Sequence, residues 1–160
     1  MTTDTPPRES QTLSIGIDVP LDAAYAFLSD PQNFSRWAAG LGEDFHQVSS
    51  GWVALTPIGR STIRFADLND YGVLDHVVEL PDGALVDVPM RVVANARGSE
   101  VMLTLFRQKD MTAEQFSADA AAVRRDLESL KSVLEAGGFH LFPEHGLGSG
   151  RTANIAHANE

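Results

Sequence analysis

The sequence predicts an α+β domain in which a curved antiparallel sheet of about seven strands wraps around one long C-terminal helix. A helical apolar stripe runs over residues 112–136, and short segments with strand character, separated by tight turns, fill residues 43–108. A further strand and two short helices precede them. None of the connections between the predicted strands leaves room for a crossover helix, so neighbouring strands are expected to pair antiparallel.

The chain is expected to enter the sheet through a strand at Thr12–Val19, because apolar and polar residues alternate there. A proline ends this strand, and the apolar spacing then becomes helical over Leu21–Ser29. Asp30 and Pro31 are a helix start signal, since Asp can cap and Pro fits the first helical position. The sequence therefore predicts a second short helix, which ends near Leu41.

The segments between the short helices and the long helix are expected to be strands joined by turns. Gly, Asn and Asp in the connections tolerate the backbone conformations that tight turns require. Pro89 cannot donate a ladder hydrogen bond, so its strand is expected to lie at an edge or to bulge there. The predicted strands are Phe45–Ser49, Trp52–Thr56, Ser61–Leu68, Val73–Leu80, Leu85–Asn95 and Glu100–Arg107.

The long helix is predicted over Thr112–Ala136, and its start and stop signals are both present. Thr112 and Gln115 have the spacing of a capping box, and two glycines follow the helix. We expect a flexible leader over residues 1–11, one domain over 12–137 and a loosely packed tail over 138–160. The apolar stripe comprises Phe116, Ala120, Val123, Leu127, Leu130 and Leu134.

Composition excludes several classes of partner. The formal net charge is −10, with 12 basic residues scattered among 22 acidic ones, so neither nucleic acid nor an anionic membrane surface is an expected partner. No run reaches the roughly 18–20 apolar residues of a membrane-spanning helix, and the first residues lack the pattern of a secretory signal. The chain has no cysteine, which is compatible with the cytoplasm. No cofactor or metal is expected, and the sequence is compatible with a homodimer.

A strongly twisted sheet curls, and only the long helix is apolar enough to cover its concave face. A curved sheet and a straight helix differ in shape, so this helix-grip arrangement predicts a cavity between them that suits a small hydrophobic molecule. The cavity is predicted from topology alone.

Two stretches resemble the START/Bet v 1-like (SRPBCC) superfamily, and specifically its bacterial polyketide cyclase/dehydrase and lipid-transport members. The first is residues 14–31, SIGIDVPLDAAYAFLSDP, with Trp37 shortly after it. The second is residues 100–107, EVMLTLFR, followed by the long helix. The resemblance covers about residues 12–136 and implies the helix-grip fold. It leaves the function open, because members bind lipids, hormones, polyketides or partner proteins.

His76 is the principal candidate for chemistry. Alternation places it on the more apolar face of its strand with Leu74, so the imidazole is expected to point inward. There it could contact a ligand or act as an acid–base group, or it could be a core histidine bonded to a backbone carbonyl. Asp75 lies on the opposite face, which rules out a simple dyad, and Asn69 is expected to shape a turn.

Five other residues are candidate ligand contacts. Trp37 and Trp52 are large enough to line a cavity, although such residues are more often simply part of the core. Arg64 is expected to face solvent when Ile63 faces the core, and in the other register it would anchor a ligand carboxylate. Val123 and Leu127 lie on the apolar stripe of the long helix and are expected to face the cavity.

Three functions are compatible with these features. The first is binding of a lipid, polyketide or similar small hydrophobic molecule. The second is a cyclase/aromatase-like enzyme that assists dehydration with His76 as the acid–base group. The third is a protein-interaction module, which would need a large exposed apolar patch.

Overall fold

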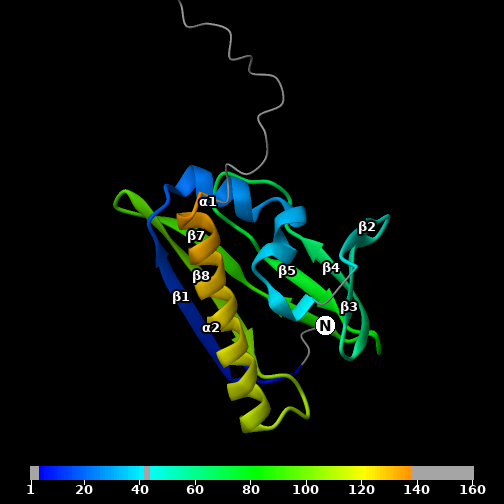
Figure 1. Cartoon of the computed structure of the whole chain (residues 1–160). Helices are drawn as coiled ribbons and strands as arrows, with labels where there is room; N and C mark the ends of the chain where they lie inside the picture. The colour runs from blue at the N-terminus through cyan, green and yellow to red at the C-terminus, as the bar shows by residue number, and fades with distance from the viewer. Residues whose placement is uncertain (1–3, 42–43, 138–160) are drawn as a thin grey trace, which may run out of the picture.

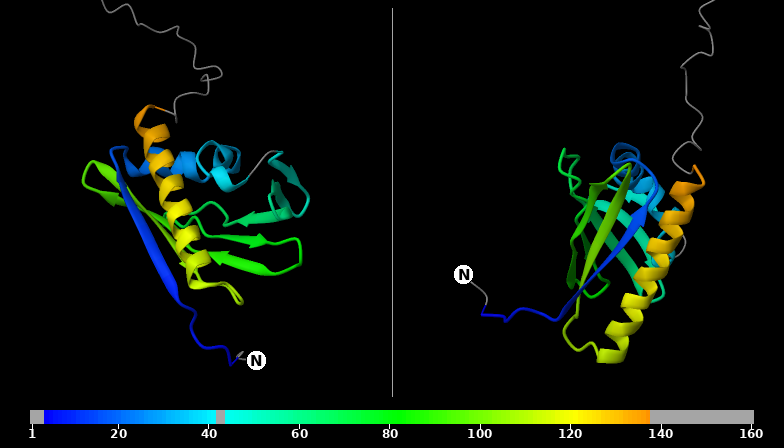
Figure 2. Two further views of the ribbon diagram at one scale, coloured as in Figure 1. Left: turned by 60° about the horizontal axis from the view of Figure 1, so that its bottom comes forward. Right: turned by 90° about the vertical axis from the view of Figure 1, so that its left-hand side faces the viewer.

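In the computed structural model, which describes residues 4–41 and 44–137, one long helix packs against two antiparallel sheets (Figure 1). The helix, α2 (Ala113–Glu135), runs beside β1 (Ser10–Ile17), as both views of Figure 2 show. A short helix, α1 (Leu21–Leu28), lies near the C-terminal end of α2. Apolar residues from α1, α2 and both sheets form one buried core.

The two sheets share no ladder of hydrogen bonds. The first has the order β1-β8-β7 and the second the order β2-β3-β4-β5-β6, with every pair antiparallel. The remaining strands are β2 (His46–Val48), β3 (Gly51–Thr56), β4 (Gly59–Phe65), β5 (His76–Glu79), β6 (Leu85–Val88), β7 (Met90–Asn95) and β8 (Gly98–Phe106).

The prediction of a single sheet with about seven strands is wrong, because the described residues form eight strands that are divided between two sheets. The predicted strand Leu85–Asn95 breaks at Pro89, where β6 pairs with β5 and β7 pairs with β8. Pro89 has no N–H to donate, but its carbonyl still accepts a hydrogen bond from the Thr104 N–H at 2.9 Å. The expected disruption at Pro89 is therefore the place where the chain changes sheets.

The second short helix is also different from the prediction. It consists of two 3₁₀ turns, η1 (Pro31–Arg36) and η2 (Ala39–Leu41), with Trp37 between them at φ −131°. The expected cap is present, because the Asp30 side chain accepts a hydrogen bond from the Gln32 N–H at 3.0 Å. Trp37 is buried edge-on against Phe34, and this packing replaces a regular helix.

The long helix agrees closely with the sequence. The capping box between Thr112 and Gln115 is formed in both directions, and Gly137 follows the helix with φ +82°. Five of the six predicted stripe residues are buried, and Val123 is partly buried against the core. β1 begins at Ser10, earlier than predicted, because polar residues extend its pairing with β8 as far as Phe106. The predicted tail, 138–160, lies outside the described residues.

Within the described ranges, no helix combines the length and the apolar character that crossing a membrane would require.

Candidate functional site

A cleft of about 230 Å³ opens between the inner face of the second sheet and α2. The strands alternate so that Ser61 and Ile63 of β4 and Val78 of β5 face it. The turns η1 and η2 cover one end, and Asp126 contributes the wall from α2. The full lining is Phe34, Ala38, Gly40, Thr56, Ser61, Ile63, Val78 and Asp126.

A second, much smaller cavity lies next to this cleft. Its volume is about 20 Å³, which is room for about one water molecule. Phe34 lines both spaces. The small cavity is lined by Tyr25, Leu28, Ser29, Phe34, Trp37, Phe65, Ala66, Val73, Leu74, His76 and Met90.

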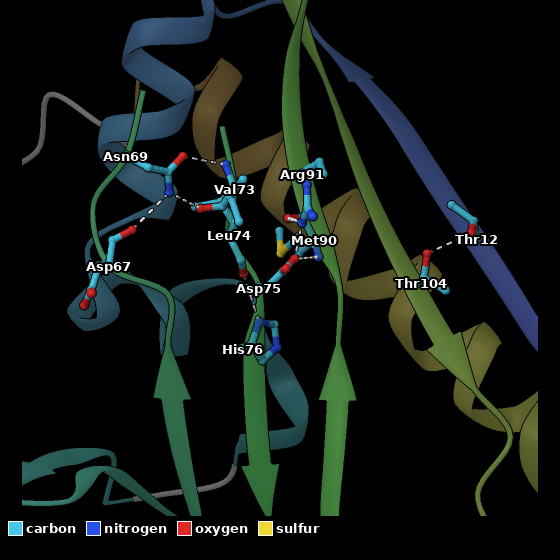
Figure 3. Close-up of polar contacts among 10 residues, drawn as sticks. All are labelled: Thr12, Asp67, Asn69, Val73, Leu74, Asp75, His76, Met90, Arg91 and Thr104. Carbon is cyan, nitrogen blue, oxygen red and sulfur yellow. Dashed lines mark hydrogen bonds and ion pairs between the residues drawn. The ribbon is translucent and has the colours of Figure 1, made fainter. Parts of the chain in front are cut away.

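His76 lines the small cavity and is the most buried titratable group there, with 6% of its surface exposed. Its Nδ1 lies 3.2 Å from the carbonyl oxygen of Leu74 (Figure 3). Because a carbonyl can only accept, Nδ1 carries the proton and Nε2 is left as an acceptor. Burial lowers the pKa of His76, opposed by the hydrogen bond to Leu74 and by the charge of Asp75. The imidazole is therefore neutral at physiological pH.

Aromatic rings enclose this imidazole. The centroid of Phe34 lies 5.4 Å from that of His76 in an edge-on arrangement, and Phe65 lies 5.6 Å away. Phe34 also meets Trp37 at 5.1 Å and Phe65 at 5.3 Å, both edge-on. Phe34 is thus the centre of the aromatic group that packs beside His76.

The segment before β5 is held by Asn69, as expected for a turn residue. Its side-chain amide donates to the carbonyls of Asp67 and Val73, and its Oδ1 accepts from the Val73 N–H (Figure 3). The same Oδ1 also accepts from the Tyr71 N–H. The Asn69 N–H in turn donates to the hydroxyl of Tyr25 at 2.8 Å. This network fixes the chain as it enters β5 and thereby fixes the direction of His76.

Asp75 points away from His76, as alternation predicts, and joins the two sheets. Its carboxylate accepts a hydrogen bond from the Met90 N–H at 2.8 Å and forms an ion pair with Arg91 (Figure 3). These contacts bridge β5 to the start of β7, next to the break at Pro89. The role of Asp75 is therefore structural, and it forms no dyad with His76.

The structure brings only part of the predicted site together. Trp37 and His76 line the small cavity. Arg64 pairs with Glu79 at 3.2 Å and lines neither space, which is the solvent-facing alternative. Trp52 stacks on Phe45 at 5.0 Å and lines neither space. The described residues include no cluster of His, Asp or Glu that could hold a metal ion.

Two helix residues that were expected to contact a ligand, Val123 and Leu127, pack into the core and line neither space. The α2 residue that lines the cleft is Asp126. Sequence reasoning missed Phe34, Ser61 and Asp126, although the apolar spacing from Phe34 to Trp37 and the acidic residue beside Leu127 were visible signals.

An exposed hollow of about 370 Å³ lies between α1, the Asn69 turn and β7. Tyr71 lines it with 82% of its surface exposed, and Leu68 nearby in sequence is 76% exposed. The sequence alone shows no obvious exposed apolar patch, and this surface becomes visible only in the tertiary structure.

No protein-family model and no curated protein matches this chain. Solved structures do match. DynU16, a protein in the dynemicin biosynthetic locus, aligns with a TM-score of 0.62 and 12% identity over 82% of this chain. The alignment covers 49% of DynU16, so the chain spans about half of that protein.

Two further solved structures are matched over nearly their whole length. Ara h 8.0201 has a TM-score of 0.57 and 8% identity over 80% of this chain and 98% of its own. The Aha1 dimer from Colwellia psychrerythraea has a TM-score of 0.61 and 17% identity over 81% and 98%. Sequence identities this low support a shared fold and no shared function. The chain has the START/Bet v 1-like (SRPBCC) fold.

Proposed function

We propose that this protein binds a small, mostly apolar molecule in the cleft between β3–β5 and α2. The observation that carries the proposal is the cleft itself, with a volume of about 230 Å³ and walls formed largely by Phe34, Ala38, Ile63 and Val78. A concave apolar space with a few polar groups is the usual form of a small-molecule site. DynU16, which has the same fold, comes from a biosynthetic locus, and a role with small molecules is compatible with that setting.

The driving force is removal of these apolar walls from water. Each 100 Å² of apolar surface that a guest and the walls bury together contributes about 2.5 kcal/mol before the costs of association. A guest that covers Ile63 and Val78 meets side chains already held in place by the sheet. Little ordering is therefore needed on the protein side, which favours binding.

His76 does not line this cleft and lies in the neighbouring small cavity. Dehydration by His76 is not part of the proposal, because the cavity beside the imidazole has room for about one water molecule and none for a substrate.

The test fills the cleft from its mouth. A Cβ atom at Gly40 would meet no heavy atom within 4 Å, so Gly40→Trp is accommodated at its Cβ and adds an indole to the lining of the cleft. The neutral fluorescent probe N-phenyl-1-naphthylamine is titrated into the original protein, into Gly40→Trp and into a control variant. We expect saturable binding to the original protein and at least about ten-fold weaker binding to Gly40→Trp.

The control is Leu68→Trp, which adds the same ring at an exposed position that lines neither space. It should bind the probe as the original protein does. Unsaturable fluorescence with the original protein, or an unchanged affinity in Gly40→Trp, refutes the proposal.

A further inference from the structure

One residue in the wall of the cleft, Ser61, has a buried hydroxyl without a hydrogen-bond partner among the described residues. Ser61 is 1% exposed, lies opposite Ala54 of β3 and lines the cleft from β4. Leaving a buried donor and acceptor unsatisfied is costly, so native proteins satisfy nearly all such groups with protein, water or ligand atoms.

The opposite wall carries a carboxylate. Asp126 lies on α2 beside the buried Leu127, at the edge of the apolar stripe. One of its oxygens, Oδ1, accepts a hydrogen bond from the Ala39 N–H at 3.2 Å, which ties α2 to η2. The described residues show no ion pair to Asp126. Partial burial raises the pKa of this carboxyl, opposed by the bond from Ala39 and the charge of Arg125.

These two groups define the chemistry that the cleft accepts. Ser61 can donate to or accept from a polar atom of the guest, and ionised Asp126 can only accept. A guest hydroxyl satisfies either group, whereas a guest carboxylate would face a like charge in a partly desolvated space. The net charge of −10 adds a further repulsion toward anions at long range.

We infer that the cleft selects an apolar molecule bearing a hydroxyl group, with Ser61 and Asp126 as its polar contacts, and rejects a carboxylate on the same skeleton. This inference rests on the proposed function, since it names the class of guest for the same cleft. It excludes free fatty acids as the preferred ligands of this protein.

The test compares 1-nonanol with nonanoate by isothermal titration calorimetry at neutral pH, with nonylamine as a third arm. We expect nonanol to bind at least about ten-fold more tightly than nonanoate. Asp126→Asn keeps an acceptor for the Ala39 N–H and should bring the two affinities to within about three-fold. Nonylamine binding more tightly than nonanol would overturn the assignment to a hydroxyl, and equal binding of nonanol and nonanoate would overturn the inference as a whole.

Ser61→Ala separates a ligand contact from a structural role. Removing an unpaired hydroxyl should raise the thermal stability of the free protein, and it should weaken nonanol binding several-fold. The matched control is Ser99→Ala, because Ser99 is also 1% exposed with an unpaired Oγ and does not line the cleft. The control should gain stability and keep its nonanol affinity.

An equal loss of nonanol affinity in Ser99→Ala, or none in Ser61→Ala, overturns the role given to Ser61. The neutral naphthylamine probe keeps this result distinct from the proposed function. Saturable probe binding without discrimination between nonanol and nonanoate refutes only the selectivity, whereas the absence of probe binding refutes the site.

Discussion

The buried imidazole of His76 should make the stability of this protein depend on pH in a specific window. Burial lowers the folded pKa of His76 below its ordinary value of 6.5, so the unfolded chain takes up a proton first as the pH falls. The stabilising contribution is therefore complete above pH 6.5 and is lost as the pH falls toward the folded pKa. The folded protein becomes progressively less stable on acidification.

The size of this effect follows from the linkage of protonation and unfolding. If the imidazole stays neutral in the folded state, the unfolding free energy of the protein falls by about 1.4 kcal/mol between about pH 8 and about pH 5.5. This value is the upper limit, and it shrinks once the folded imidazole also protonates. Carboxylates titrate in the same experiment, so the quantity to compare is the difference between two variants.

The assay is urea unfolding of the original protein and of His76→Gln across that pH range. The free-energy difference between the two should fall with decreasing pH by up to about 1.4 kcal/mol. His46→Gln is the control for loss of a histidine at a more exposed position, since 46% of the His46 side chain is exposed. NMR titration of the His76 ring in the original protein provides a second readout if the variant is too unstable.

A constant difference for His76→Gln, together with a ring that titrates at or above its ordinary pKa, would refute the burial argument. It would mean that the cavity beside His76 is open enough to hydrate the imidazolium.

Two further predictions concern the packing around the site. Leu130→Ala should lower the unfolding free energy by about 2–5 kcal/mol, because Leu130 is fully buried in the core. Val123→Ala, at a partly buried position, should lower it clearly less. Equal losses of unfolding free energy in chemical unfolding would contradict the helix orientation. Gly72→Ala should destabilise the protein more than Gly83→Ala in the same measurement. Both glycines have positive φ, but only the Cβ at Gly72 would collide with the Val92 carbonyl. Similar losses would show that the close approach of this turn to β7 is absent.

The sequence by itself determined every feature that depends on near neighbours along the chain. The α2 stripe, its capping box and the Asn69 turn follow from spacings of a few residues, and all three are present. Alternation alone placed His76 inward and Asp75 outward. The break at Pro89 was predicted as a disruption, because the missing N–H is a property of that residue alone.

The tertiary structure decided the features that depend on residues far apart. The aromatic group around Phe34 brings together residues of η1, β4 and β5, and the Asp126 bond to Ala39 joins positions 87 residues apart. Val123 and Leu127 pack into the core, and Asp126 is the helix residue that lines the cleft, because interiors pack to high density wherever side chains can reach. The unpaired hydroxyl of Ser61 depends on which polar groups fail to come near it, and that is settled only by the complete fold.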